Sequence, residues 1–158
     1  MIYTECKPDS TLVKMLGMPK NHIIHQQGKP EVCKQLEKRT NWKGMIDEDP
    51  FSVQPTYLQK LEETGNSSNY GFRVLKDAAK NNDLIILSPK LEGWILKAAK
   101  EAKVDIERYN LPNDEEKLHE EINTDLRKFE RLVNDLKGNS RMIKALERAL
   151  MQRGGNYQ

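Results

Sequence analysis

Apolar positions in the first hundred residues form short continuous runs, at 1–6, 22–25, 43–47 and 83–88. The last of these, DLIILS, is the strongest. Segments with helical spacing lie between or after the runs, at 9–16, 30–39 and 91–102. Strands that alternate with helices indicate crossover connections and a parallel sheet. The strands of such a sheet are covered on both faces and are therefore apolar throughout.

The region 50–72 lacks this regularity. FSVQP mixes strand and turn residues, and GNSSN at 65–69 predicts a loop. Residues 71–79 are expected to add a further strand. The pattern therefore predicts an α/β fold with an open, mainly parallel sheet of about four core strands and one or two more, flanked by helices.

The character of the chain changes after residue 104. Asn113 is expected to cap a helix that carries one apolar stripe. The stripe consists of Leu118, Ile122, Leu126, Phe129, Leu132, Val133 and Leu136. Residues 138–140 end this helix and cap another, from Arg141 to about Gln152. We therefore expect an α/β domain at 1–104 and a helical extension at 105–158, packing on or beside it.

Charge narrows the function classes only a little. Lys and Arg number 26 against 24 for Asp and Glu, a net charge of +2, which decides neither for nor against a nucleic-acid partner. Arg141, Lys144 and Arg148 recur at three- and four-residue spacing, so they are candidates for phosphate contact or simply a solvated helix face.

Cysteine use and hydropathy bear on location. Cys6 and Cys33 form neither a metal spacing nor a disulfide framework, which is typical of reduced thiols in a cytoplasmic protein. The longest apolar run, at 84–87, is far shorter than a membrane span, so no membrane partner is expected.

Carboxylates cluster at the predicted strand ends. Glu5 ends the first strand, and Asp47 and Asp49 end the third. On an extended chain Asp47 and Asp49 point to one side and Glu48 to the other. Asp9 and Glu92 lie at the starts of the helices that follow the first strand and DLIILS. Because functional groups gather at the carboxyl ends of parallel strands, all five could meet there.

Such a cluster is costly unless a cation neutralises it. Oxygen ligands select Mg²⁺ or Mn²⁺ rather than zinc, and these ions activate water and stabilise charge on phosphoryl groups. Simpler interpretations stay open: an acidic turn before Pro50, a helix cap at Asp9, and a helix-dipole contact at Glu92. His22, His25 and His119 share no ligand spacing and are expected to be ordinary surface or edge residues.

These motifs carry a family resemblance. Residues 5–9, ECKPD, resemble the E-x-x-x-D motif of the Toprim domain of topoisomerases, primases and related nucleases, and 45–49, MIDED, resembles its D-x-D motif. Residues 91–96, LEGWIL, resemble a block of small stand-alone Toprim proteins and of nucleases related to the overcoming-lysogenisation-defect family. The resemblance covers about residues 1–104. Cys6 departs from it, because glycine often follows the glutamate.

The resemblance implies a Mg²⁺- or Mn²⁺-dependent nuclease, or a nuclease subunit, that acts on DNA or RNA. Asp47 and Asp49 would hold the metal, and Glu5 would be a ligand or a general acid or base. Asp9 and Glu92 are candidates for a second metal. Lys7 would stabilise the phosphoryl transition state, and Lys144 could be brought over by the fold.

Two other hypotheses remain. The chain could be a non-catalytic Toprim-fold binding module whose C-terminal helices bind a partner protein or a second copy. It could also bind a phosphate ligand on a flavodoxin-like fold, although it has no glycine-rich phosphate loop and Gly28 stands alone.

Overall fold

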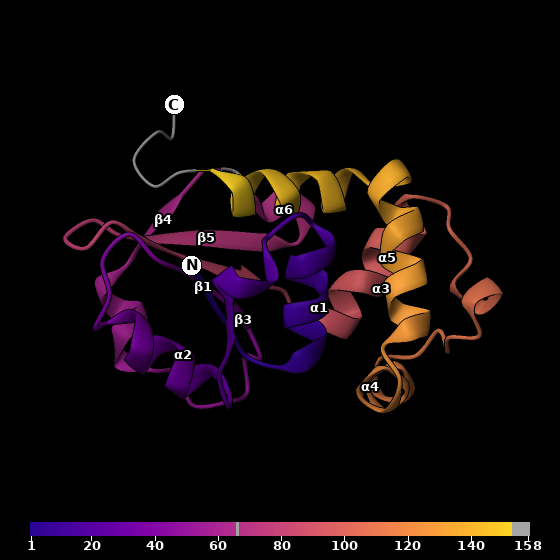
Figure 1. Ribbon diagram of the computed structural model, residues 1–158, viewed down its shortest axis with the longest axis horizontal. Helices are drawn as coiled ribbons and strands as arrows, with labels where there is room; N and C mark the ends of the chain where they lie inside the picture. The colour runs from indigo at the N-terminus through magenta and orange to yellow at the C-terminus, as the bar shows by residue number, and fades with distance from the viewer. Residues whose placement is uncertain (66, 153–158) are drawn as a thin grey trace.

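The computed structural model describes residues 1–65 and 67–152, and it shows one β-sheet with helices packed on both faces (Figure 1). The strands are β1 (Ile2–Thr4), β2 (Ile23–His25), β3 (Lys43–Asp47), β4 (Glu62–Thr64), β5 (Phe72–Asp77) and β6 (Asn82–Leu87). The α-helices are α1 (Lys7–Met15), α2 (Lys29–Leu36), α3 (Leu91–Glu101), α4 (Glu115–Thr124), α5 (Arg127–Asn139) and α6 (Arg141–Met151). Short 3₁₀ helices lie at Lys20–His22, Thr56–Lys60, Ser67–Tyr70 and Ile106–Tyr109.

The sheet has six strands in the order β2-β1-β3-β6-β5-β4. The four predicted core strands, β1, β2, β3 and β6, pair in parallel, which confirms the α/β class. The sheet as a whole has six strands and not four, because β5 and β4 extend the parallel core by antiparallel pairing and supply the one or two further strands that were expected. The residues between β5 and β6, 78–81, are too few for a crossover helix, so this pair must be antiparallel.

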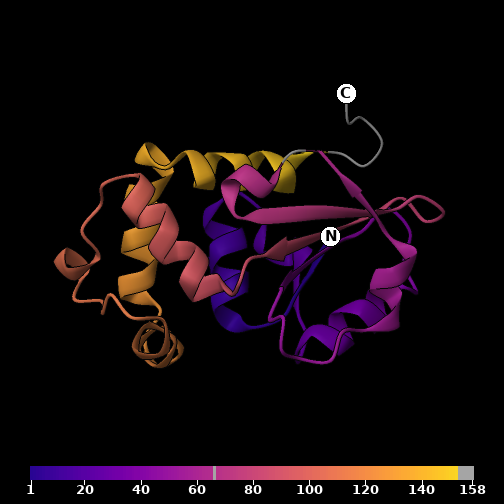
Figure 2. The ribbon, with the colours of Figure 1, turned by 180° about the vertical axis from the view of Figure 1, so that it is seen from behind.

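Each face of the sheet has its own core. On one face, α2 packs Val32 and Leu36 against Ile46, Leu84 and Ile86. On the other face, α1, α3 and α6 cover alternate residues of the same strands. This alternation is the two-residue period of strands that are buried on both sides. Figure 2 shows the arrangement from behind, with α6 lying along one side of the sheet.

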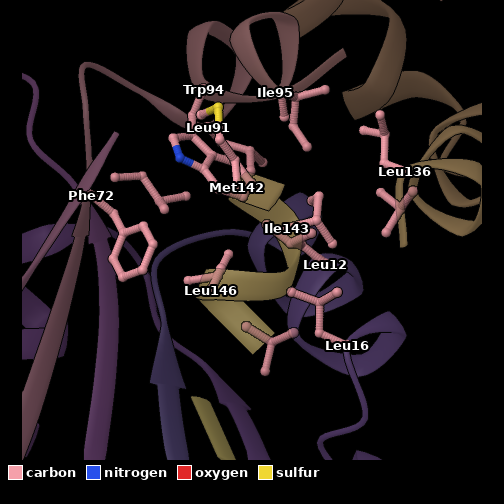
Figure 3. Close-up of a cluster of buried hydrophobic side chains, with 14 of the residues drawn as sticks. Leu12, Leu16, Phe72, Leu91, Trp94, Ile95, Leu136, Met142, Ile143 and Leu146 are labelled. Atoms are coloured by element: carbon pink, nitrogen blue, oxygen red, sulfur yellow. The ribbon is translucent and has the colours of Figure 1, made fainter. Parts of the chain in front are cut away.

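The larger core joins the C-terminal helices to the rest of the chain. Figure 3 shows Ile143 and Leu146 of α6 beside Leu12 of α1, with Phe72 of β5 and Trp94 of α3 in the same cluster. The apolar residues of α4 and α5 belong to this cluster too. Residues 105–152 therefore share one core with the sheet.

The predicted long helix after residue 113 is in fact two helices, α4 and α5. Its cap is Asp114, which accepts a hydrogen bond from Lys117 N at 3.0 Å, and not Asn113. The backbone leaves the helical conformation at Asp125, whose side chain accepts from Arg127 N at 2.9 Å. This bond competes with helix continuation and opens α5.

No helix in the described part of the chain combines the length and the apolarity that crossing a bilayer requires.

Candidate active site

Three strands end where two helices begin, and the predicted carboxylates lie at this junction. Glu5 follows β1, and Asp47 is the last residue of β3. Asp9 and Glu92 lie in the first turns of α1 and α3. The parallel pairing of β1, β3 and β6 aligns these carboxyl ends side by side. Glu5, Asp9, Asp47 and Glu92 are called the acidic cluster below.

Backbone N–H groups fix two members of the acidic cluster. Asp47 N donates to Glu5 Oε2 at 2.8 Å, and Leu91 N donates to Asp47 Oδ1 at 2.9 Å. The second bond satisfies an N–H in the first turn of α3, whose own N-cap, Lys90, makes no side-chain cap bond. The backbone of β3 thus orients Glu5, and the first turn of α3 orients Asp47.

Asp9 is almost fully buried, with 1% of its surface exposed. The N-cap of α1 is Cys6, and Asp9 is the third helical residue, which corrects the expected cap at Asp9. Cys6 N donates to Asp9 Oδ2 at 3.2 Å. Asp9 Oδ1 is buried and accepts no hydrogen bond from the described residues. An unpartnered buried carboxylate oxygen is costly, so this atom is a natural place for a ligand.

The negative charges of the four acids affect one another's pKa values. Burial, followed by the charges of Asp9, Glu5 and Glu92, raises the pKa of Asp47 to about 9. Burial, with the charges of Glu5 and Glu92, raises the pKa of Asp9 to about 7. Burial also raises the pKa of Glu5, although the N–H of Asp47 opposes the shift. Asp9 and Asp47 therefore retain protons near neutral pH when no cation is bound.

Asp49 departs from the expected geometry. Its backbone lies in the left-handed region, at φ 39°, so the extended alternation that would place it beside Asp47 does not apply. Its charge nevertheless raises the pKa of Glu5, so it lies near the rim of the cluster. Glu48 accepts a hydrogen bond from Ser88 Oγ and is tied to the start of the β6–α3 connection.

The predicted basic residues lie apart from these contacts. Lys7 is exposed at the first position of α1, two residues from Glu5. Arg141, Lys144 and Arg148 are exposed on α6, and none of them contacts the acidic cluster in the part of the chain that the structure describes. The proposed approach of Lys144 to the cluster gains no support from this placement.

Lys29, which the sequence interpretation missed, is a buried cation close to the cluster. It is 4% exposed, and its charge lowers the pKa of Glu5 against the effect of burial. Its Nζ lies 2.6 Å from Glu48 O, 3.3 Å from Ser52 Oγ and 3.2 Å from Gln54 Oε1. A lysine in the first turn of a helix gives no local signal for this role, since its partners lie some twenty residues on.

His119 is exposed, as expected of a surface residue, but it also contacts the acidic cluster. It comes from α4, and its Nδ1 lies 2.8 Å from Glu92 Oε1. The His119 side chain is 65% exposed and the Glu92 side chain 7%, so the pair links the buried cluster to solvent. Because α4 and α3 are packed by tertiary contacts, no spacing in the sequence reveals this pair.

The donor chemistry fits a hard divalent cation. Carboxylate oxygens are the ligands that Mg²⁺ and Mn²⁺ prefer, and the unpartnered Asp9 Oδ1 is available to one. Within residues 1–65 and 67–152, no three His, Cys, Asp or Glu side chains already form a group that could hold a metal ion. Binding would therefore require the side chains to close in on the ion from their anchored positions.

Comparison of the chain with family models, with characterised proteins and with solved structures finds no match.

Proposed function

We propose that this protein is a Mg²⁺- or Mn²⁺-dependent phosphodiesterase that cleaves nucleic acid, with a Toprim-like α/β core. The observation that carries the proposal is the set of buried and half-buried carboxylates at the carboxyl ends of the parallel strands. Asp9 and Asp47 have raised pKa values, and neither pairs with a Lys or Arg in the described residues. Buried acids are normally paired or coordinate a metal.

Each member of the cluster has a role in this proposal. Asp47 and Glu5 would hold the ion, and their backbone hydrogen bonds limit how far they reorient. Asp9 would supply its free Oδ1. Glu92, paired with His119, would hold a second ion or orient a water. When bound, such an ion lowers the pKa of water and stabilises charge on phosphoryl oxygens.

Cations at the rim would meet the substrate. Lys7 is exposed beside Glu5, and Lys90 is exposed immediately before the Leu91 amide that holds Asp47. Either ammonium could contact a phosphate that flanks the scissile bond. Lys29 is occupied by oxygen atoms of the segment that follows β3, so it supports this segment and does not contact substrate.

Cleavage assays test the proposal. The purified protein with Mn²⁺ is expected to cut DNA or RNA, and Asp47→Asn and Glu5→Gln are expected to lower the rate by about 100-fold or more. Both substitutions keep the size of the side chain and its capacity to accept the observed backbone bond. Glu62→Gln, in exposed edge strand β4, is the matched control and should cut at the wild-type rate.

The proposal fails if wild type does not cut with Mn²⁺ or Mg²⁺. It also fails if Asp47→Asn and Glu5→Gln both cut as fast as wild type, since the activity would then come from another site or from a contaminant.

The alternative, a binding module that uses the C-terminal apolar stripe, has less support. Leu118, Ile122, Phe129, Leu132 and Leu136 are each fully buried within the chain itself. The stripe that motivated a partner is therefore already covered by α1, α3 and α6.

A further inference from the structure

Two apolar side chains in the segment that directly follows Asp47 are almost fully exposed. Phe51 is 100% exposed and Val53 is 90% exposed. They belong to residues 48–54, here called the rim loop, which follows Asp47 directly. A single exposed apolar side chain is common on protein surfaces, but Phe51 and Val53 lie two residues apart on one hydrogen-bonded loop and form a small apolar patch.

The rim loop is built to present these side chains. Ser52 N donates to Asp49 O at 2.9 Å, which closes a turn with Pro50 and Phe51 at its centre. Proline suits the second position of such a turn. Gln54 Nε2 donates to Asp49 O at 3.2 Å and to Ser52 O at 3.0 Å. Hydrogen bonds within the loop therefore hold the backbone of Phe51 in a defined conformation.

The loop is also anchored from below. The buried Lys29 ammonium lies within hydrogen-bond distance of Glu48 O, Ser52 Oγ and Gln54 Oε1. On the other side, Asp49 N donates to Pro89 O at 2.9 Å, next to the start of α3. By contacting three oxygen atoms of the rim loop, the buried Lys29 holds the exposed Phe51 at a fixed position relative to the carboxylates.

From these observations we infer that Phe51, supported by Val53, is a stacking platform for an unpaired nucleobase of a single-stranded substrate. This inference rests on the proposed function and names its substrate class. An aromatic ring at a fixed position is what base stacking needs, and it tolerates any base because every base has a π-face. A base inside a duplex is already stacked on its neighbours, so only an unpaired one is free to bind.

Charge and size favour this occupant over a protein. The exposed cations Lys7 and Lys90 flank the cluster and suit a phosphate backbone. Two side chains are far too few for a stable protein interface, which needs roughly 800 Å² from each partner. A single base covers a patch of this size.

Anisotropy titrations with a fluorescein-labelled oligothymidylate of about 12 nucleotides test the inference. Ca²⁺ replaces Mn²⁺, and a gel checks that the strand stays intact. Phe51→Ala should weaken binding by about 5- to 100-fold, and Phe51→Trp should retain it. The control is Met151→Ala, which removes another exposed apolar side chain, one packed beside Gly17 at the far end of α1. It should bind as wild type does.

A duplex of the same length should bind Phe51→Ala and wild type equally. The inference is overturned if wild type does not bind the single strand, if Phe51→Ala binds it as tightly as wild type, or if the loss is equal on duplex. It is also overturned if Phe51→Ala changes the oligomeric state in sedimentation, because the ring would then serve a protein contact. The binding assay does not depend on cleavage. If the protein binds the single strand through Phe51 but does not cut it, the proposed function is wrong and the inference about Phe51 stands.

Discussion

The sheet buries acids at both ends of its parallel strands, but within the described residues lysines form direct ion pairs with a buried strand acid only at the amino end. At the amino end, Asp83 is 2% exposed, and it lies 3.0 Å from Lys43 Nζ and 3.5 Å from Lys76 Nζ. At the carboxyl end, Asp9 and Asp47 have no Lys or Arg within ion-pair distance among the described residues. The same fold thus treats buried carboxylates in two ways.

We interpret the difference as one between a structural acid and the acids to which we assign the proposed function. A buried acid with two lysines is neutralised by the chain itself and needs nothing from outside. Buried acids without such partners take up protons or an external cation, and the raised pKa values of Asp9 and Asp47 record this need.

The largest effect on stability is expected at the amino end. Asp83→Ala leaves Lys43 and Lys76 facing each other across a mostly buried space, because their side chains are only 13% and 19% exposed. We expect the free energy of unfolding to fall by about 3 kcal/mol. Urea titration followed by circular dichroism measures it. A loss below about 1 kcal/mol would mean that the two lysines do not depend on Asp83, and it would contradict a structural role for this acid.

The opposite sign is expected at the carboxyl end. Asp47→Asn removes a charge that the fold disfavours, while Asn Oδ1 can still accept from Leu91 N. The folded-state pKa of Asp47 is raised from 3.8 to about 9. Its stabilising contribution is therefore complete below about pH 4 and is lost as pH rises toward 9. Without metal, the variant should be about 2 kcal/mol more stable than wild type at pH 8.

Thermal and urea unfolding at several pH values in EDTA check this second expectation. The advantage of Asp47→Asn should shrink at pH 5 and vanish as the pH falls below the unfolded-state pKa of 3.8, where wild-type Asp47 becomes protonated in both states. An advantage independent of pH, or a destabilised variant at pH 8, would show that the Asp47 charge is not the source.

The smallest effect is expected at the solvent side of the cluster. His119→Ala removes a 2.8 Å contact to Glu92, but the His119 side chain is 65% exposed, so water replaces most of the interaction. The free energy of unfolding should change by about 0.5 kcal/mol. A loss above about 2 kcal/mol would indicate that His119 neutralises the cluster as Lys43 neutralises Asp83, which would weaken the contrast.

Much of the fold was readable from the sequence because burial on both faces makes parallel strands continuously apolar. The local pattern alone predicts the strands β3 and β6 and the helix α3, with the sequences KGMID, DLIILS and LEGWILKAAKE. The edge strand β4, EET, was missed because it is short and polar. The break between α4 and α5 was missed although Asn123-Thr124-Asp125 carries side chains that compete with helical hydrogen bonds.

Only those candidate site residues that lie at the ends of predicted strands could be identified from the sequence. Glu5 and Asp47 follow from the sheet topology, since adjacent parallel strands bring their carboxyl ends together. Lys29, His119 and the folded rim loop could not be predicted, because their partners are set by tertiary packing. Asp49 misled the alternation argument because its positive φ ends the extended chain one residue after Glu48.

Titration calorimetry with Mn²⁺ in two buffers of different ionisation enthalpy tests the central claim, that the acidic cluster is a divalent-cation site. Mn²⁺ is expected to bind wild type and to release protons at pH 7, because Asp9 and Asp47 give up theirs to the ion. Asp47→Asn should bind far more weakly, and the Glu62→Gln control should match wild type. No Mn²⁺ binding at millimolar concentration, or equal binding by Asp47→Asn, would contradict it.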